Sequence, residues 1–332
     1  MRPVNRRLLR LSFCLLIAGF FFWLALRRLD VRQVGIAISH VGWPAVMLSL
    51  LFVASAYWIR VIRWWVMVRA CNSKVPLSAC VWPLLVGFSV NNLAPLRIGD
   101  AVRILSFQEK LRTPVAQLFG TLVLERLLDL TVLLCFLLAG IAALRTADLP
   151  AASVHLAVVA VSFGLIGWIL LLLTARHFEK LLLRLCELRL LVSRSWNGRA
   201  AQLVMQLFSA LAIVRGPVTA TKLLCLSFGV WICEGAVFVA IADSLTPQAG
   251  WFGPWFALAT GTLSTLIPGP PGYIGTFEFF TMSGLMAYGV SPNLSAATAL
   301  VVHAVLWLFP VVVGLSYFLR PSTRSLLRSR AT

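Results

Sequence analysis

The sequence predicts an all-α, polytopic helical membrane protein with about six full spans and two opposed re-entrant hairpins. Hydrophobic residues make up 60% of the 332 residues, charged residues make up 12%, and the mean hydropathy is +0.91. Apolar runs of the roughly 20 residues that a spanning helix needs recur along the chain. No segment is long and polar enough to form a separate soluble domain. We therefore expect residues 1–332 to form a single integral membrane domain.

An even number of crossings returns both termini to the same side of the membrane. Basic residues gather in cytoplasmic segments, and most of the 29 Lys and Arg residues fall on the side of the termini in this topology. We therefore expect a bacterial inner-membrane protein with both termini in the cytoplasm. The predicted full spans are 11–26, 43–68, 115–144, 154–173, 223–243 and 296–319.

Two further segments have alternative interpretations. The basic start of the chain and the run 11–26 resemble a signal peptide. Arg27 and Arg28 stand where a cleavage site would need small residues, so we expect an uncleaved first span. Residues 178–199 alternate Leu with charged residues at helical spacing. This pattern predicts an amphipathic helix on the inner membrane surface, and a connector packed on the bundle fits equally well.

Two apolar stretches do not fit a simple crossing. Residues 77–93 are followed by Ala-Pro-Leu-Arg-Ile-Gly-Asp, and residues 251–267 are followed by Pro-Gly-Pro-Pro-Gly-Tyr-Ile-Gly. Pro and Gly interrupt helices, and such backbone is tolerated at membrane depth only where protein buries it or water lines it. We therefore predict a broken hairpin at about 77–112 that enters from the cytoplasm. A second, at about 251–289, would enter from outside.

The tips of the two predicted hairpins resemble each other. Residues 95–99 and 271–275 both read Pro-x-x-Ile-Gly. Opposed hairpins with similar tips, one in each half of a chain, are typical of an inverted repeat with a site between the tips.

Composition and motifs exclude several functional classes. The net charge of +18 would indicate nucleic acid in a soluble protein, but the cytoplasmic bias of basic residues explains it here, and we expect no nucleic-acid partner. The 7 Cys and 4 His are scattered without a C-x-x-C pair, which predicts neither a disulfide framework nor a metal centre. The chain lacks G-x-S-x-G, H-E-x-x-H and Walker motifs. We expect no metal and no cofactor.

Charged residues lie inside one predicted span, namely Glu125, Arg126 and Asp129. A charge at bilayer depth costs at least about 2.5–3.5 kcal/mol and is tolerated mainly beside a partner or a water-filled cavity. Arg126 and Asp129 can pair on a helix, whereas the adjacent Glu125 and Arg126 do not face each other. The excess negative charge requires either a protonated carboxyl or another cation. Arg97 and Arg103 on the first hairpin are the nearest cations in sequence. The cluster either locks that hairpin to the span or faces a transported species.

Four other charged residues are candidates. Arg60 and Arg63 share a helix face among tryptophans, a position typical of interface anchors. Contact with a phosphate is the functional alternative. Glu278 follows the second Pro/Gly break, where it fits a helix-capping role or a role in proton coupling or headgroup binding. Glu234 has no obvious local partner and is a weaker candidate of the same type.

Three motifs in sequence order indicate a family. Residues 95–103 match a P-x-R-x-G-(E/D)-x-x-R hairpin, and residues 125–129 match an E-R-x-x-D span. Residues 268–278 match a P-G-G-x-G-x-x-E turn less closely, because Pro270 and Pro271 disturb the glycine spacing. Together they resemble the flippase-like family that shares the transmembrane region of lysylphosphatidylglycerol synthases. The resemblance covers most of the chain. We expect this stand-alone chain to lack the soluble aminoacyl-transferase domain of complete synthases, and therefore to lack lysyl transfer.

The resemblance implies a transporter that moves an anionic or phosphate-bearing lipid between leaflets. The expected partners are membrane lipids, together with a lipid-modifying enzyme or a glycosyltransferase. Arginines would contact phosphate, and carboxylates would set the charge of the cavity or carry protons. The expected headgroup residues are Arg97, Asp100, Arg103, Glu125, Arg126, Asp129 and Glu278, with Arg60, Arg63 and Glu234 as secondary candidates.

Two alternatives remain open from the sequence. The first is an intramembrane enzyme acting on a polyprenyl-phosphate or glycolipid, with Asp100, Glu125 and Asp129 as acid/base groups. The second is an accessory subunit of a glycosyltransferase.

Overall fold

The computed structural model describes residues 29–144, 216–267 and 269–319, together with isolated residues between 19 and 27 and between 155 and 166. Every regular element within these residues is a helix, which confirms the all-α prediction. Apart from a few positions, the predicted spans 11–26 and 154–173 lie outside the described residues, as does the predicted amphipathic helix 178–199.

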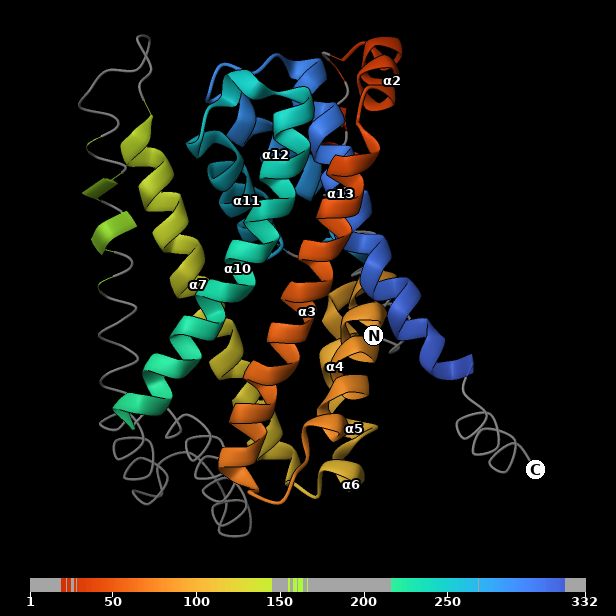
Figure 1. Cartoon of the computed structure of the whole chain (residues 1–332), viewed down its shortest axis with the longest axis vertical. Coiled ribbons are helices and arrows are strands. Elements are labelled where there is room, and N and C mark those ends of the chain that lie inside the picture. The colour runs from red at the N-terminus through yellow and green to blue at the C-terminus, as the bar shows by residue number, and fades with distance from the viewer. Residues whose placement is uncertain are drawn as a thin grey trace, which may run out of the picture.

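Four long helices form the frame of the described part, and each corresponds to one of the predicted spans (Figure 1). They are α3 (Trp43–Cys71), α7 (Val115–Ala143), α10 (Pro217–Leu245) and α13 (Pro292–Leu315), the last extended by the 3-10 helix η5 (Ser316–Leu319). Among the described residues, three helices are long and apolar enough to cross a membrane: α3, α10 and α13 with η5. The fourth, α7, has the same 29-residue length as α3 and carries the charged cluster.

Proline and a capping aspartate mark where several helices begin. α3, α10 and α13 each have a proline in the first turn, where its missing N–H costs no intrahelical hydrogen bond. A further helix, α2 (Val31–Ser39), begins after Asp30, whose Oδ1 accepts the backbone N–H of Arg32 at 2.9 Å. Asn293 at the start of α13 accepts the N–H of Asp30 at 3.0 Å, which holds α2 against α13. The sequence analysis predicted no helix in this segment, which lies between the predicted spans 11–26 and 43–68.

The first hairpin is built from α4 (Leu77–Leu93), the 3-10 helix η1 (Pro95–Arg97), α5 (Ile98–Leu105) and α6 (Gln108–Leu111). α5 runs back along α4, and Gly87 on α4 and Gly99 on α5 allow the two helices to pack closely. A methyl group on Gly99 would collide with the backbone oxygen of Gly87 and with Asn91. The absence of side chains at these glycines therefore sets the position of Arg103, which lies one helical turn further along α5.

The second hairpin is built from the 3-10 helix η3 (Pro247–Ala249), α11 (Phe252–Ser264), the 3-10 helix η4 (Pro271–Tyr273) and α12 (Thr276–Met286). α11 and α12 are antiparallel and closely packed. A methyl group on Gly261 would collide with Thr281, and one on Gly284 would meet Thr260 at 2.6 Å.

The two hairpins lie at opposite ends of the molecule, with α4, α5 and α6 toward one end and α11 and α12 toward the other (Figure 1). α4 and α12 both pack against α13, and α11 packs against α7 and α10. This arrangement brings the tip of each hairpin toward the middle of the bundle, where η1 and η4 meet.

Candidate functional site

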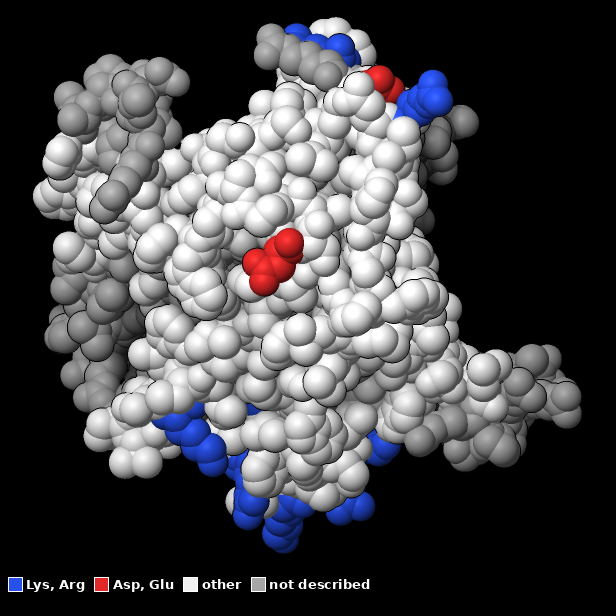
Figure 2. Space-filling model, turned by 45° about the horizontal axis from the view of Figure 1, so that its top comes forward, with Lys and Arg blue, Asp and Glu red and all other residues white. Residues whose placement is uncertain are grey.

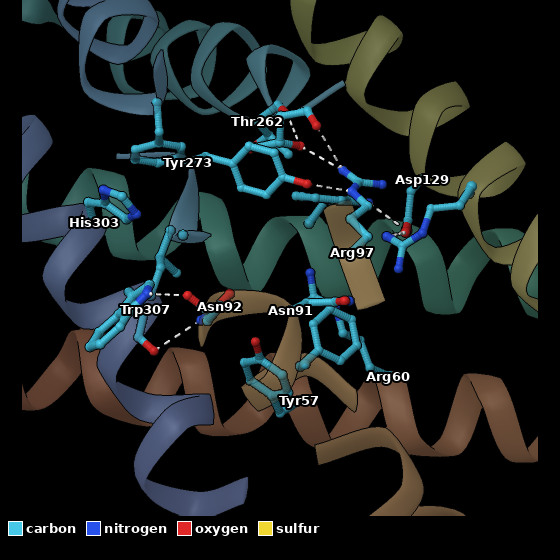
Figure 3. A pocket seen from close by; sticks show the side chains of 17 residues that line it. Tyr57, Arg60, Asn91, Asn92, Arg97, Asp129, Thr262, Tyr273, His303 and Trp307 are labelled. Carbon is cyan, nitrogen blue, oxygen red and sulfur yellow. Dashed lines mark hydrogen bonds and ion pairs between the residues drawn. The ribbon is translucent and has the colours of Figure 1, made fainter. Parts of the chain in front are cut away.

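The two hairpin tips enclose a cavity of about 160 Å³ (Figure 3). Aromatic, amide and charged side chains line it together. The first tip contributes Asn91, Asn92 and Arg97; the second contributes Thr262, Thr265, Gly272 and Tyr273; and the long helices contribute Tyr57, Arg60, Arg126, Asp129, Trp231, His303 and Trp307.

Arg97 joins the two tips across this cavity. Its backbone is left-handed, with φ 53°, at the junction of η1 and α5. Its Nε donates to the hydroxyl of Tyr273 at 2.7 Å, and its Nη2 donates to the carbonyl and hydroxyl oxygens of Thr265 at 3.2 and 2.9 Å (Figure 3). No described residue accepts a hydrogen bond from Nη1, and no described carboxylate pairs with this guanidinium. Arg97 therefore presents an uncompensated positive charge and free donors to the cavity.

The second tip makes a tight turn in which Gly272 and Gly275 have positive φ angles. Gly272, with φ 66°, packs against Trp307 so closely that a methyl group would lie 2.6 Å from the indole nitrogen. Trp307 and Asn92 exchange two hydrogen bonds, each of 3.1 Å, between the side chain of one and the backbone oxygen of the other. Pro271 occupies the first position of η4, so the unusual Pro270-Pro271 pair is compatible with a tight turn. Asn92 and Trp307 thus tie the first tip to α13.

The charged cluster on α7 recruits cations from two other elements. Arg103 of α5 lies 3.1 Å from Glu125, and Arg63 of α3 lies 2.6 Å from Asp129 and 3.7 Å from Glu125. Arg63 and Arg103 are fully buried, and the guanidinium of Arg103 stacks on Trp64 at 3.7 Å. The cluster is therefore an ion network that connects α3, α5 and α7.

Arg126 connects this network to the cavity. It lies 3.6 Å from both Asp100 and Asp129, and its side chain is 33% exposed, whereas Glu125 is almost completely buried. Asp100 also accepts a hydrogen bond from the side chain of Asn91 at 2.9 Å. Arg126 is thus the cation of the network that is most open to a ligand.

Arg60 and Glu234 form a second ion pair at the edge of the cavity. Their closest atoms are 2.6 Å apart, and both residues are buried. The guanidinium lies over the rings of Tyr57, Phe88 and Trp231 at 5.3 to 5.6 Å, where cation–π attraction stabilises it. Trp231 also donates to Asp129 at 3.0 Å, which links this pair to the cluster on α7.

Glu278 caps α12 and contacts a histidine that faces the cavity. Its Oε2 accepts the backbone N–H of Gly275 at 2.7 Å, as in a capping box. Its Oε1 forms a short contact with Nδ1 of His303 on α13. The capping role predicted for Glu278 is confirmed, and it coexists with a link to a titratable side chain.

The ion pairs of the cluster on α7 differ in part from those that the sequence predicts. Arg103, one of the two expected candidates, is the cation nearest to Glu125, and Arg63 approaches it from α3, whereas Arg97 points to the other hairpin. The Arg126–Asp129 pair is confirmed. The statement that Glu125 and Arg126 do not face each other is wrong, because the long arginine side chain reaches back to within 3.8 Å.

The interface-anchor interpretation of Arg60 and Arg63 is also wrong. Both side chains are buried and ion-paired, because α10 supplies Glu234 and α7 supplies Asp129. Glu234 accordingly has a partner, which the sequence did not reveal because Arg60 is far away in the chain.

Sequence reasoning missed several residues of the cavity. Tyr57, Trp231 and His303 lie in apolar helices far from the three motifs. For His303 a signal existed, because an ionisable residue inside a predicted span is a candidate functional residue by default. Within the described residues, no group of three His, Cys, Asp or Glu side chains is placed to hold a metal ion.

The arginines around the cavity outnumber the carboxylates with which they can pair. With Glu278 set apart, because it pairs with His303, five arginines and four carboxylates remain, namely Arg60, Arg63, Arg97, Arg103 and Arg126 with Asp100, Glu125, Asp129 and Glu234. Every carboxylate in this set has an arginine within 4 Å, so the surplus positive charge is that of Arg97. An anion that entered the cavity would neutralise it.

Comparison with known protein families gives a match that covers most of the chain. Residues 11–314 match the family model described as the lysylphosphatidylglycerol synthase TM region. All three motifs read from the sequence lie within the matched range. A search among curated proteins finds no match.

Proposed function

The chain belongs to the lysylphosphatidylglycerol synthase transmembrane-region family, and we propose that it moves an anionic or phosphate-bearing lipid between the leaflets of a bacterial inner membrane. The lipid headgroup passes through the cavity between the two hairpin tips, while the acyl chains stay in the surrounding lipid. The family supports a role in handling lipids, and the chemistry of the cavity supports the choice of headgroup.

The observation that carries this proposal is the surplus charge of Arg97. A guanidinium is well suited to phosphate because its planar fork donates two parallel hydrogen bonds. Arg97 lines the cavity, has donors that no described residue uses and has no carboxylate partner. A phosphate would therefore find both its charge and its hydrogen-bonding needs met at this position, with Arg126 as the second exposed cation.

The proposed transport path uses the two hairpins as opposed re-entrant elements. The first enters from the cytoplasm and the second from outside, in an inverted repeat whose site lies between the tips. The matching local structure of the tips supports this arrangement. Arg97 and Tyr273 occupy equivalent positions in the two Pro-x-x-Ile-Gly segments, both end a 3-10 helix, and both have left-handed backbones, with φ 53° and 59°.

The surface charge supports the proposed orientation. Exposed lysines and arginines gather at the end of the molecule where α3 ends and α4 begins (Figures 1 and 2). Such clusters are typical of cytoplasmic surfaces. The exposed basic residues at this end include Arg69, Lys74, Lys110 and Arg112.

The alternative of an intramembrane enzyme receives less support from the site. Asp100, Glu125 and Asp129 each form an ion pair with an arginine, so all three carboxylates are already engaged in holding the helices together. We propose accordingly that the chain is not an enzyme. Mass spectrometry of lipids from deletion and overexpression strains separates the two functions, because an enzyme changes covalent products whereas a transporter changes only their sidedness.

An accessory subunit would co-purify with its glycosyltransferase and would be inactive alone.

The direct test of the headgroup contact uses Arg97 variants in reconstituted vesicles. We expect Arg97→Gln to slow exchange of tail-labelled phosphatidylglycerol by about tenfold or more, because a charge-assisted hydrogen bond contributes about 1.5–3 kcal/mol. Arg97→Lys should fall between this variant and the natural protein, since lysine keeps the charge and loses the fork. Arg32→Gln, on the exposed face of α2, is the matched control and should exchange lipid normally. Normal exchange by folded Arg97→Gln would refute the assigned contact.

A further inference from the structure

The contact between His303 and Glu278 joins the cavity to the second hairpin tip. His303 lies on α13, lines the cavity and packs against the ring of Phe277, with centroids 4.6 Å apart. Its Nδ1 contacts one oxygen of Glu278, while the other oxygen holds the N–H of Gly275 beside η4. The same carboxylate therefore contacts a titratable ring and the backbone that presents Tyr273 to Arg97.

This pair has the chemistry of a proton carrier. Imidazole is the side chain that ordinarily changes charge between about pH 5 and 8. Because Nδ1 is engaged by Glu278, the ring gains or loses its proton at Nε2. The protonated pair is electrically neutral, as imidazolium and carboxylate, and the deprotonated pair carries the single negative charge of Glu278. One proton thus changes the charge beside the cavity by one unit.

The surrounding groups determine the sign of the effect on an anion. Besides His303, the titratable or charged groups that line the cavity are Tyr57 and Arg60 from α3, Arg97 from η1, Arg126 and Asp129 from α7, and Tyr273 from η4. A proton on His303 makes this lining more positive and favours an anionic headgroup. When His303 loses this proton, the negative charge of Glu278 remains uncompensated and repels the same headgroup.

We propose that His303 and Glu278 couple lipid movement to the proton gradient, one proton entering with each anionic headgroup. This inference rests on the proposed lipid transport and adds its energy source. The proton is taken up at Nε2 on the acidic side as the headgroup enters. It is released on the alkaline side as the headgroup leaves, so the lipid accumulates in the leaflet that faces the alkaline compartment.

The test measures how a pH gradient affects the leaflet ratio, which a passive carrier leaves at equality. The full chain is reconstituted into phosphatidylcholine vesicles that contain a trace of short-chain, tail-labelled phosphatidylglycerol. The labelled lipid in the outer leaflet is then extracted with albumin. One proton moved per lipid predicts that a gradient of one pH unit shifts the ratio by up to about tenfold. Protein-free vesicles measure the spontaneous redistribution.

Variants assign the effect to the pair. His303→Gln keeps an amide donor for Glu278 and removes the titration, so the gradient should no longer shift the ratio. Glu278→Gln keeps the capping-box geometry, for which glutamine also serves. It removes the carboxylate that repels the headgroup when His303 has lost its proton, so the response should weaken. His40→Gln carries the same substitution at the exposed end of α2 and should respond like the natural protein.

The outcomes separate this proposal from the proposed function. If the natural protein moves no lipid, lipid transport itself fails. If it equilibrates lipid at a ratio that ignores the gradient, transport stands and proton coupling is overturned. A natural response retained in folded His303→Gln or in folded Glu278→Gln would remove the pair from the mechanism.

Discussion

At the scale of residues, two buried arginines hold the charged cluster of α7 in place. Arg103 and Arg63 approach Glu125 and Asp129 from α5 and α3, and neither guanidinium is exposed to solvent. A buried ion pair contributes little net stability compared with apolar side chains of the same size, but removing one partner leaves an uncompensated charge. These arginines therefore act mainly to fix the position of the first hairpin.

Arg103→Leu tests this positioning role. We expect it to reduce the free energy of unfolding by about 3–5 kcal/mol, because Glu125 loses its nearest cation in a buried site. The measurement is unfolding in detergent followed by tryptophan fluorescence. The double variant Arg103→Leu/Glu125→Leu should recover part of the loss, since no unpaired charge remains. Equal stability of Arg103→Leu and the natural protein would show that the pair is not structural.

The sequence predicts that Glu125 needs a partner, but it does not identify all the ion pairs and hydrogen bonds around the cavity. The count of local charges required either a protonated carboxyl or another cation, and Arg103 was near enough in the chain to be a candidate. Arg63 and Glu234 could not be paired from sequence, because their partners lie on helices that only the fold brings close. Tyr273 was part of a motif, but no neighbouring residue in the sequence indicated that its hydroxyl would accept a hydrogen bond from Arg97.

At the scale of elements, close helix packing inside each hairpin positions the tips. Gly99 and Gly87 let α5 approach α4 until backbone atoms touch, and Gly261 and Gly284 do the same for α11 and α12. Small residues at such crossings are typical of helix packing in membranes. The cavity between the tips therefore depends on residues that do not line it.

Gly99→Ala tests this dependence. The added methyl group would overlap the backbone oxygen of Gly87, so α5 must move and carry Arg103 away from Glu125. We expect a loss of about 1–3 kcal/mol in stability, as for other overpacked cores, together with slower lipid exchange. Gly35→Ala is the matched control, because nothing lies within 4 Å of that position in α2. Unchanged stability of Gly99→Ala would contradict the close approach.

The helices of both hairpins could be predicted from the sequence. The contact between the two hairpin tips could not. The run 77–93 became α4 with the same bounds, since its apolar residues end at the Ala-Pro break. The five-residue match between the tips predicted a relation that the local conformations now support. The match could not indicate that Arg97 and Tyr273, at equivalent positions, would bond to each other.

At the scale of the whole molecule, the two hairpins lie at opposite ends of the bundle, and their tips line the same cavity (Figure 1). The proposed orientation places the first hairpin on the cytoplasmic side and the second outside. The uneven distribution of exposed Lys and Arg over the surface supports this assignment (Figure 2).

Cysteine labelling tests the opposed orientation. Ser106 lies in the turn after α5 and Gln248 lies in η3, and both are exposed. In a background without the 7 natural cysteines, Ser106→Cys should react with a membrane-impermeant maleimide only from the cytoplasmic side, and Gln248→Cys only from outside. Labelling of both positions from one side would contradict the opposed hairpins.

The central claim is that this chain moves anionic lipid headgroups, and leaflet exchange in vesicles measures it most directly. Purified, folded protein is reconstituted with tail-labelled lipids of different headgroups, including phosphatidylglycerol, lysyl-phosphatidylglycerol and phosphatidylcholine. We expect accelerated exchange of phosphate-bearing anionic lipid relative to protein-free vesicles, with zwitterionic phosphatidylcholine slower. Exchange that matches protein-free vesicles for every headgroup would contradict the account.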